Sequence, residues 1–190
     1  MDLGKALSEL PLPKLFVFDL DYTLWPFWCD THVVPPFHKN KKGTVTDKCK
    51  FPIVLYNEVL DILPALKEKG CLLAAASRTH TPDIAEELLQ LLDIGKYFDF
   101  KEIYPGSKVK HFKKFKENSG IQYEEMIFYD DEQRNIVEIG KLGVTTQYVN
   151  DGLTITDVIN GKKNCARKEY GIKDCKYIVK KNHKLQKDCN

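Results

Sequence analysis

The sequence predicts an α/β protein built as a three-layer, Rossmann-like parallel sheet. Short and wholly apolar runs recur along the chain, as expected of strands that are buried on both faces. Amphipathic stretches with helix-capping and helix-ending residues separate these runs. The chain has 190 residues, 43% hydrophobic and 29% charged, which suits one globular domain with a substantial core. Because strands that alternate with helices pair in parallel, we expect one open sheet covered on both sides.

Five strands are predicted, at residues 15–18, 72–76, 98–103, 126–129 and 144–149. Helices are expected between and after them, at about 56–69, 82–92, 107–119, 132–142 and 154–160. Pro64 falls inside the first of these helices and predicts a kink or a boundary there. Pro82 suits the first turn of the second helix, and Ser107 suits the start of the third. Gly120 ends the third helix.

Residues 26–55 interrupt the alternation of strands and helices. Four prolines and a glycine divide this stretch, with β-branched residues between them. The composition predicts a loop and a small β-hairpin inserted after the first strand, which we call the flap. Since no other insertion is as long, we expect no large cap domain over the sheet.

The charge is unevenly distributed along the chain. The net charge is +2, but residues 161–190 hold ten Lys and Arg against three Asp and Glu. We therefore predict one domain over residues 1–160 and a basic, weakly ordered tail over 161–190. No segment is long and apolar enough to span a membrane, and the N-terminus lacks the order of a signal peptide. The six cysteines form no CxxC pair, so we expect no structural zinc site. Because the sequence shows no secretion signal, we expect free thiols and a cytoplasmic protein.

The chemically distinctive residues all follow predicted strands, and parallel strands end at one edge of an open sheet. Asp19 and Asp21 come directly after the first strand and share a face of the chain. Because their charges repel and are costly to desolvate, a divalent cation with oxygen ligands is expected there, and Mg²⁺ is usual where phosphate is handled. The remaining candidates are Ser77 and Arg78 after the second strand, Lys108 at a helix start, and Asp130 and Asp131 after the fourth strand.

Each of these residues alone has a plainer explanation. A serine or an aspartate at such a position often caps a helix, and a lysine is usually solvated. Together, however, they offer a nucleophile, an acid/base, a hydroxyl group, two cations and further carboxylates. Phosphoryl transfer through an aspartyl-phosphate needs this set of groups.

The pattern resembles the haloacid dehalogenase (HAD) superfamily of phosphatases. Asp19-Leu20-Asp21-Tyr22-Thr23 matches the DxDxT motif of that superfamily. Ser77, Lys108 and the pair Asp130-Asp131 match its second, third and fourth motifs in order. The resemblance covers about residues 12–160, implies a HAD-like fold, and leaves the basic tail unexplained.

The resemblance implies a role for each matching residue. Asp19 would be the nucleophile that forms an aspartyl-phosphate, and Asp21 would be the acid/base. The Asp19 carboxylate, the Asp21 main-chain carbonyl and one acidic residue of the Asp130-Asp131 pair would hold Mg²⁺. We expect Asp131 to ligate the metal directly and Asp130 to act behind it or through water.

Three further residues would bind the phosphoryl group. Ser77 would contact its oxygens, and Lys108 would neutralise the charge that builds up during transfer. Arg78 lies outside the general superfamily pattern. Its planar guanidinium suits a second contact with phosphate or with a substrate carboxylate.

The expected function is therefore that of a Mg²⁺-dependent phosphoric monoester hydrolase. A site without a large cap admits a phosphorylated small molecule or a phosphoprotein, and it tolerates the water that hydrolysis needs. The resemblance suggests phosphotyrosine-type protein substrates or sugar phosphates, including phosphorylated glycation products. The alternatives are a nucleic-acid 3′-end phosphatase, with nucleic acid the less favoured partner, and a non-catalytic phosphate-binding scaffold.

Overall fold

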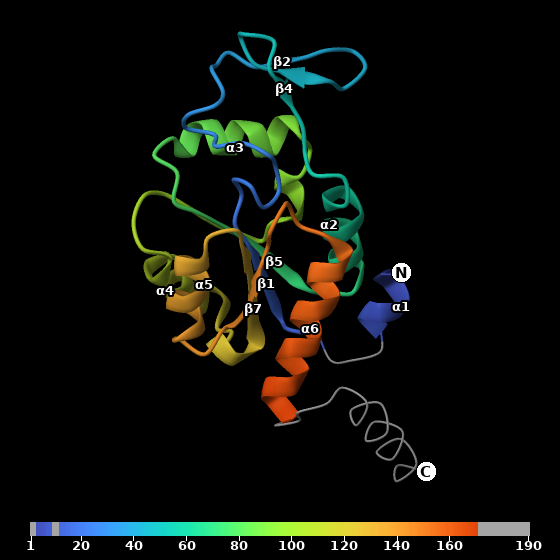
Figure 1. Cartoon of the computed structure of the whole chain (residues 1–190), viewed down its shortest axis with the longest axis vertical. Helices are drawn as coiled ribbons and strands as arrows, with labels where there is room; N and C mark the ends of the chain where they lie inside the picture. The colour runs from blue at the N-terminus through green and yellow to red at the C-terminus, as the bar shows by residue number, and fades with distance from the viewer. Residues whose placement is uncertain (1–2, 9–11, 171–190) are drawn as a thin grey trace.

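A five-stranded parallel sheet lies at the centre of the computed structural model, which describes residues 3–8 and 12–170 (Figure 1). All four pairs of neighbouring strands are parallel. The predicted Rossmann-like sheet is thus confirmed, with β1 in the middle. In spatial order the strands are β6 (Phe100–Ile103), β5 (Leu72–Ser77), β1 (Leu15–Phe18), β7 (Met126–Asp130) and β8 (Thr145–Tyr148).

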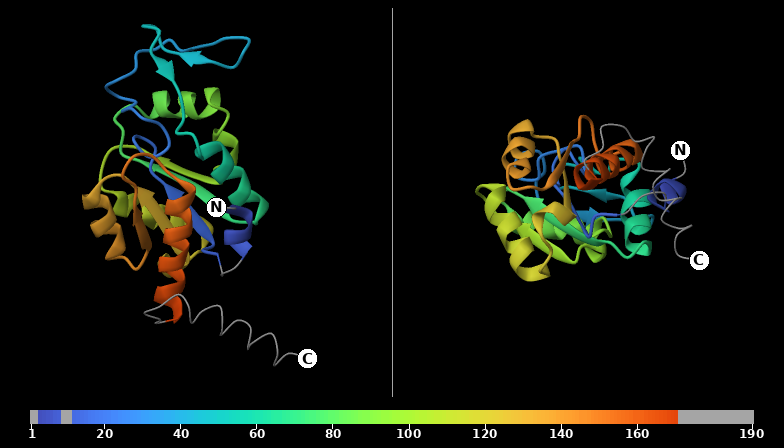
Figure 2. Two further views of the ribbon diagram at one scale, coloured as in Figure 1. Left: turned by 45° about the vertical axis from the view of Figure 1, so that its right-hand side comes forward. Right: turned by 90° about the horizontal axis from the view of Figure 1, so that it is seen from below.

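Helices cover both faces of the sheet, which makes the predicted three layers (Figure 2). Alternate residues of β1 point to opposite faces and belong to two separate apolar clusters. One cluster packs against α2 (Val59–Glu68), α3 (Pro82–Leu91) and α6 (Ile155–Tyr170), and it also includes α1 (Leu3–Ser8). The other packs against α4 (Lys108–Ser119) and α5 (Gln133–Gly140). Two short 3-10 helices, η1 (Gly95–Tyr97) and η2 (Tyr123–Glu125), precede β6 and β7.

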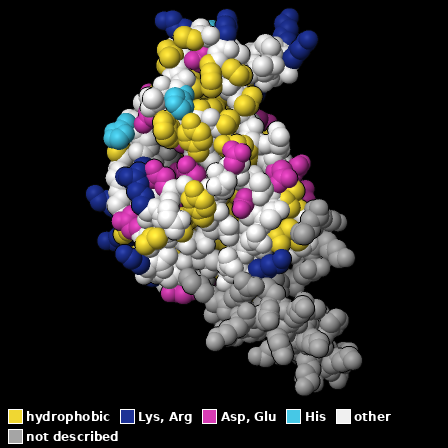
Figure 3. Space-filling model, in the orientation of Figure 1, with side chains coloured by type: hydrophobic (Ala, Val, Ile, Leu, Met, Phe, Trp, Pro, Cys, Tyr) yellow, Lys and Arg dark blue, Asp and Glu magenta, His cyan; other side chains and the backbone are white. Residues whose placement is uncertain are grey.

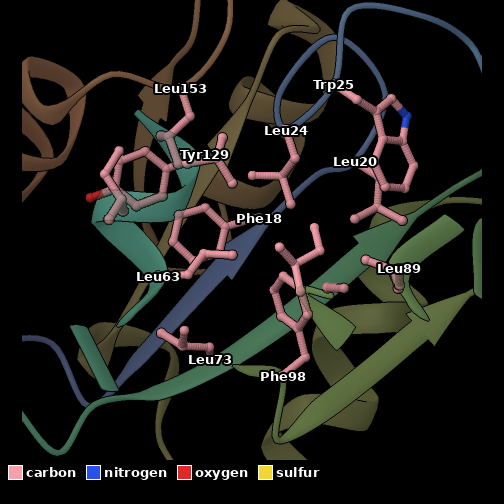
Figure 4. Packing of buried hydrophobic residues seen from close by; sticks show 14 of the residues in the cluster. Phe18, Leu20, Leu24, Trp25, Leu63, Leu73, Leu89, Phe98, Tyr129 and Leu153 are labelled. Atoms are coloured by element: carbon pink, nitrogen blue, oxygen red, sulfur yellow. The ribbon is translucent and has the colours of Figure 1, made fainter. Parts of the chain in front are cut away.

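The larger cluster reaches from the sheet up to the loop that follows β1 (Figure 4). Phe18 stacks on Tyr129 of β7 with ring centroids 5.2 Å apart. Leu24 and Trp25 extend the same packing beyond the end of the strand, and both are fully buried. Burying a large apolar side chain contributes roughly 1.5–3 kcal/mol, so this packing anchors the loop that carries Asp21.

Several predicted helix boundaries shift in the structure. The first predicted helix, α2, begins at Val59 rather than at residue 56, and it contains Pro64. The last predicted helix was expected to end at residue 160, but α6 continues to Tyr170. Gly161 therefore lies inside a helix, where its missing side chain lets α6 approach Ile127 and Tyr129 of β7. Helix α1 was not predicted.

The domain boundary predicted at residue 160 consequently falls within α6. Lys162 is 1% exposed and donates hydrogen bonds to the carbonyl oxygens of Ala6 and Leu7, both at 2.7 Å. This part of the predicted tail thus packs on the domain. The rest of the predicted tail, residues 171–190, lies outside the described residues.

The flap contains three short strands rather than the predicted hairpin. Strands β2 (His38–Lys39), β3 (Val45–Thr46) and β4 (Pro52–Ile53) form an antiparallel sheet in that order. The first turn closes where the Gly43 amide donates to the Asn40 carbonyl at 3.0 Å, and the second where the Lys50 amide donates to the Asp47 carbonyl at 3.1 Å. The flap projects from the body above α3 (Figures 1 and 2).

Two further expectations concern the membrane and the thiols. Within residues 3–8 and 12–170, no helix combines the length and apolarity that crossing a membrane would demand. Three cysteines in this part of the chain are free thiols: Cys29, Cys49 and Cys71.

Candidate active site

The C-terminal ends of β1, β5 and β7 open into a cleft of about 380 Å³. Six of the seven predicted site residues line it, namely Asp19, Asp21, Ser77, Arg78, Lys108 and Asp131. Asp130 is fully buried beneath the cleft. Register explains the convergence, because Phe18 of β1 lies between Ala75 of β5 and Tyr129 of β7. The residues that follow these strands therefore meet at one edge.

The ammonium group of Lys108 contacts residues at the ends of β1, β5 and β7. Its Nζ pairs with Asp19 Oδ1, and it donates to Asp130 Oδ2 at 2.6 Å and to the Ala76 carbonyl at 2.8 Å. Burial alone lowers the pKa of Lys108, but the two carboxylates more than reverse this and raise it overall. Lys108 is therefore a fixed positive charge beside Asp19.

Asp19 sits at the base of the cleft and is 8% exposed. Burial raises its pKa well above the usual value, and this effect together with the negative charges of Asp130 and Asp21 outweighs the attraction of Lys108. A buried carboxylate with this balance of charges gains strongly from an additional cation.

The carboxylates also fit a hard divalent metal ion. Asp19, Asp130 and Asp131 each offer a carboxylate oxygen, and these three atoms lie within 4.8 Å of one another. Burial and the neighbouring Asp130 raise the pKa of Asp131 to about 6, which reflects an excess of negative charge. Oxygen ligands from carboxylates are those that Mg²⁺ prefers.

Asp130 and Asp131 differ in their surroundings. Both oxygens of Asp130 are already engaged, because Asn135 Nδ2 donates to them at 3.1 and 3.0 Å and the Glu132 amide donates to Oδ1 at 2.7 Å. Asp131 instead lines the cleft. This difference favours Asp131 as the direct ligand and Asp130 as the residue that supports it and Lys108.

Asp21 is held by the loop that follows it. Trp25 Nε1 donates to Asp21 Oδ1 at 2.6 Å, and the Cys29 amide donates to the same oxygen at 3.3 Å. The pKa of Asp21 is raised, chiefly by burial, although these hydrogen bonds oppose the shift. The other oxygen, Oδ2, has the Cys29 thiol at 3.6 Å. Both carboxylate oxygens of Asp21 thus have donors from the loop that follows it.

Ser77 and Arg78 stand on the β5 side of the cleft. Ser77 ends β5 and is 2% exposed, and its hydroxyl oxygen accepts the Thr79 amide at 3.3 Å. Arg78 Nη1 donates to Asn135 Oδ1 at 3.2 Å, while its buried Nε has no hydrogen-bond partner among the described residues. Arg78 therefore retains a donor for an anionic ligand.

Sequence reasoning missed two residues of this site. Trp25 was not among the predicted site residues, yet its ring nitrogen donates to Asp21. In Figure 4 that nitrogen points away from Leu20 and the packed cluster. Asn135 connects Arg78 to Asp130. Its position five residues after Asp130, in the first turn of a helix, was the available signal.

Together the fold and the cleft define a phosphatase-type domain of the HAD superfamily. A family model described as Acid Phosphatase matches residues 11–168. The chain therefore belongs to the Acid Phosphatase family.

Similar proteins agree with this assignment. The chain is 49% identical to human (Homo sapiens) magnesium-dependent phosphatase 1 over 84% of its own length and 91% of that protein. It is 42% identical to a HAD-like hydrolase superfamily protein of Schizosaccharomyces pombe, over 73% of this chain and 87% of the other.

Two solved structures share the fold. One is a HAD-superfamily hydrolase from Ehrlichia chaffeensis, with a TM-score of 0.58 and 14% identity over 80% of this chain and 96% of the other. The second is the N-terminal part of a Bacteroides fragilis protein that contains a phosphatase domain, solved with Mg. Its TM-score is 0.56, with 16% identity over 80% of this chain and 39% of that one.

Proposed function

We propose that this protein is a Mg²⁺-dependent phosphatase that hydrolyses phosphomonoesters through an aspartyl-phosphate on Asp19. The observation that carries the proposal is the buried Asp19 carboxylate at the base of the cleft, paired with Lys108 and flanked by further carboxylates. The 49% identity to a protein named magnesium-dependent phosphatase 1 supports it.

The first half of the proposed reaction transfers the phosphoryl group to the enzyme. A carboxylate oxygen of Asp19 forms a bond to phosphorus while the bond from phosphorus to the leaving oxygen breaks. Asp21 donates its proton to that leaving oxygen. Lys108, Ser77 and Arg78 bind the phosphoryl oxygens and offset their charge.

The second half returns the enzyme to its starting state. Asp21, now ionised, accepts a proton from a water molecule whose oxygen bonds to phosphorus. The bond between phosphorus and Asp19 breaks, and inorganic phosphate leaves. In this proposal the Asp19 and Asp131 carboxylates and the Asp21 main-chain carbonyl hold Mg²⁺, with Asp130 behind them. When bound, the metal supplies the positive charge that lets an anionic nucleophile meet an anionic substrate.

The proposed substrates are phosphotyrosine-type proteins or sugar phosphates, including phosphorylated glycation products. The partly exposed Trp28 of the flap lines the cleft. A planar leaving group can pack against such a ring.

The test is hydrolysis of an aryl phosphate by the wild type and by Asp19→Asn, each with Mg²⁺ and with EDTA. We expect turnover by the wild type with Mg²⁺ alone. An aryl oxide leaves with little help from an acid, so Asp21→Asn should still complete the first half but lack the base for the second. This variant should therefore accumulate a phosphorylated enzyme, and mass spectrometry detects the added phosphoryl group on Asp19. Full activity of Asp19→Asn would refute the covalent mechanism, and activity in EDTA would refute the metal. Wild-type protein that binds aryl phosphate without turnover would support the scaffold alternative.

A further inference from the structure

The flap exposes apolar side chains next to the cleft. Trp28, Val34, Phe51 and Val54 are between 39% and 49% exposed, although all are large and apolar. Hydrophobic side chains gather on this part of the surface in Figure 3. Trp28 lines the cleft itself, so one of these exposed side chains lies at the proposed active site. Large apolar side chains that gather on one part of a surface are typical of a site that binds a partner.

The flap also carries an excess of positive charge. Residues 26–55 hold five lysines and two aspartates, whereas residues 1–160 as a whole have a net charge of −5. Lys39 is engaged, since its Nζ donates to the Leu91 carbonyl at 2.7 Å. The other four are exposed and form no ion pair with a described residue: Lys41, Lys42, Lys48 and Lys50. Lys and Arg side chains mark the outer end of the flap in Figure 3.

A packed underside holds this surface in place. Asp47 is 1% exposed and accepts the Val34 amide at 3.0 Å and the Phe51 amide at 2.8 Å. The Phe51 ring meets Phe27 edge to face, with centroids 6.1 Å apart. Two of the exposed apolar residues are therefore fixed by the buried side of the flap, which lowers the entropy cost of binding.

We propose that the flap is a docking surface for an acidic, partly apolar segment of a phosphorylated protein whose phosphoresidue enters the cleft. This inference rests on the proposed phosphatase function. The lysines complement acidic side chains of the segment, and the exposed Val34, Phe51 and Val54 contact its apolar side chains.

A peptide fits this surface better than a nucleic acid does. Residues 26–55 contain no arginine, although arginine is the residue best suited to phosphate recognition. Three cations line the cleft, Arg78, Lys108 and Arg134, but so do several carboxylates, among them Asp30 and Glu132. This mixed charge suits one phosphoryl group better than a continuous polyanion. A peptide can place its acidic residues on the flap alone.

Binding of a labelled peptide tests the docking surface without relying on turnover. The probe is a fluorescent phosphotyrosine peptide with glutamates and leucines on one side, and the comparison peptide has glutamine at each glutamate. The flap variant is Lys42→Gln/Lys48→Gln/Lys50→Gln. The matched control is Lys110→Gln/Lys113→Gln/Lys114→Gln, which removes three exposed charges from α4 instead. A third variant, Val34→Ser/Val54→Ser, probes the apolar part.

We expect the flap triple variant to bind the acidic peptide about tenfold more weakly, since each exposed ion pair contributes modestly. Val34→Ser/Val54→Ser should weaken both peptides. The α4 control should bind the acidic peptide as the wild type does, and all three should hydrolyse p-nitrophenyl phosphate normally.

Three results would overturn the inference. One is unchanged binding of the acidic peptide by the flap triple variant, and another is an equal loss in the α4 control. The third is a larger loss for a 3′-phosphorylated oligonucleotide than for the acidic peptide, which would assign the surface to nucleic acid. Wild-type protein without p-nitrophenyl phosphatase activity would count against the proposed function, while the binding measurement would still decide the docking surface.

Discussion

Replacing Lys108 by methionine removes a cation that two buried carboxylates share. The Lys108 side chain is 1% exposed, and its Nζ contacts Asp19, Asp130 and the Ala76 carbonyl. Removing one partner of such a buried ion pair lowers the free energy of unfolding by about 3–5 kcal/mol, because the other charges remain uncompensated. At about 2–4 °C per kcal/mol for a chain of this size, the expected fall in Tm is roughly 6–20 °C. Turnover should fall at least about a hundredfold.

The loss of stability in Lys108→Met should grow as the pH rises. Burial already raises the pKa of Asp19, and removing the Lys108 charge raises it further. A carboxyl whose pKa is raised in the folded protein stabilises the fold below its unfolded pKa of about 3.9, and this contribution is lost as pH rises through the folded pKa. The free energy of unfolding of Lys108→Met should therefore lie only slightly below that of the wild type near about pH 4.5, and far below it near about pH 8.

Urea denaturation in EDTA at both pH values measures this, with Lys101→Met as the matched control. Lys101 pairs with Glu86 at the surface, where the two side chains are 33% and 35% exposed. Its loss should cost no more than about 1 kcal/mol. If Lys108→Met near about pH 8 is as stable as Lys101→Met, the buried ammonium does not offset the carboxylates and the reasoning fails.

Three further predictions concern other parts of the molecule. Trp25→Phe keeps an aromatic ring but removes the donor that lies 2.6 Å from Asp21. The rate of alkyl phosphate hydrolysis should then fall about tenfold more than the rate for an aryl phosphate, whose good leaving group needs less acid catalysis. Equal losses for both substrates would contradict a role of Trp25 in acid catalysis. Because burial raises the pKa of Asp131 to about 6, its ionisation costs stability progressively between its unfolded pKa of about 3.9 and about pH 6. In EDTA, Asp131→Asn should be about 1 kcal/mol more stable than wild type near pH 8, and urea denaturation should show this difference shrinking as the pH falls from about 6 toward about 4. Gly161→Ala should cost about 1–3 kcal/mol despite a better helix propensity. The new Cβ would lie 2.6 and 2.7 Å from side chains of β7. In the control Gly140→Ala the nearest atom is 3.6 Å from the new Cβ. Thermal unfolding should therefore show a lower Tm for Gly161→Ala and no fall in Tm for Gly140→Ala.

The sequence by itself determined the order of strands and helices and the edge at which the chemistry lies. Both follow from local patterns, because a short apolar run such as 15–18 suits a strand buried on both faces, and the residue after such a strand emerges at the end of the sheet. The convergence of Asp19, Ser77 and Lys108 was thus predictable without any contact being known.

Tertiary structure alone decided how these residues are held. The contact of Trp25 with Asp21 and the engagement of Asp130 by Asn135 depend on how loops and helices pack, which spacing along the chain does not encode. The same reason explains α6, which continues through Gly161 although glycine disfavours a helix interior. There the sheet leaves no room for a side chain, and packing against β7 outweighs local propensity.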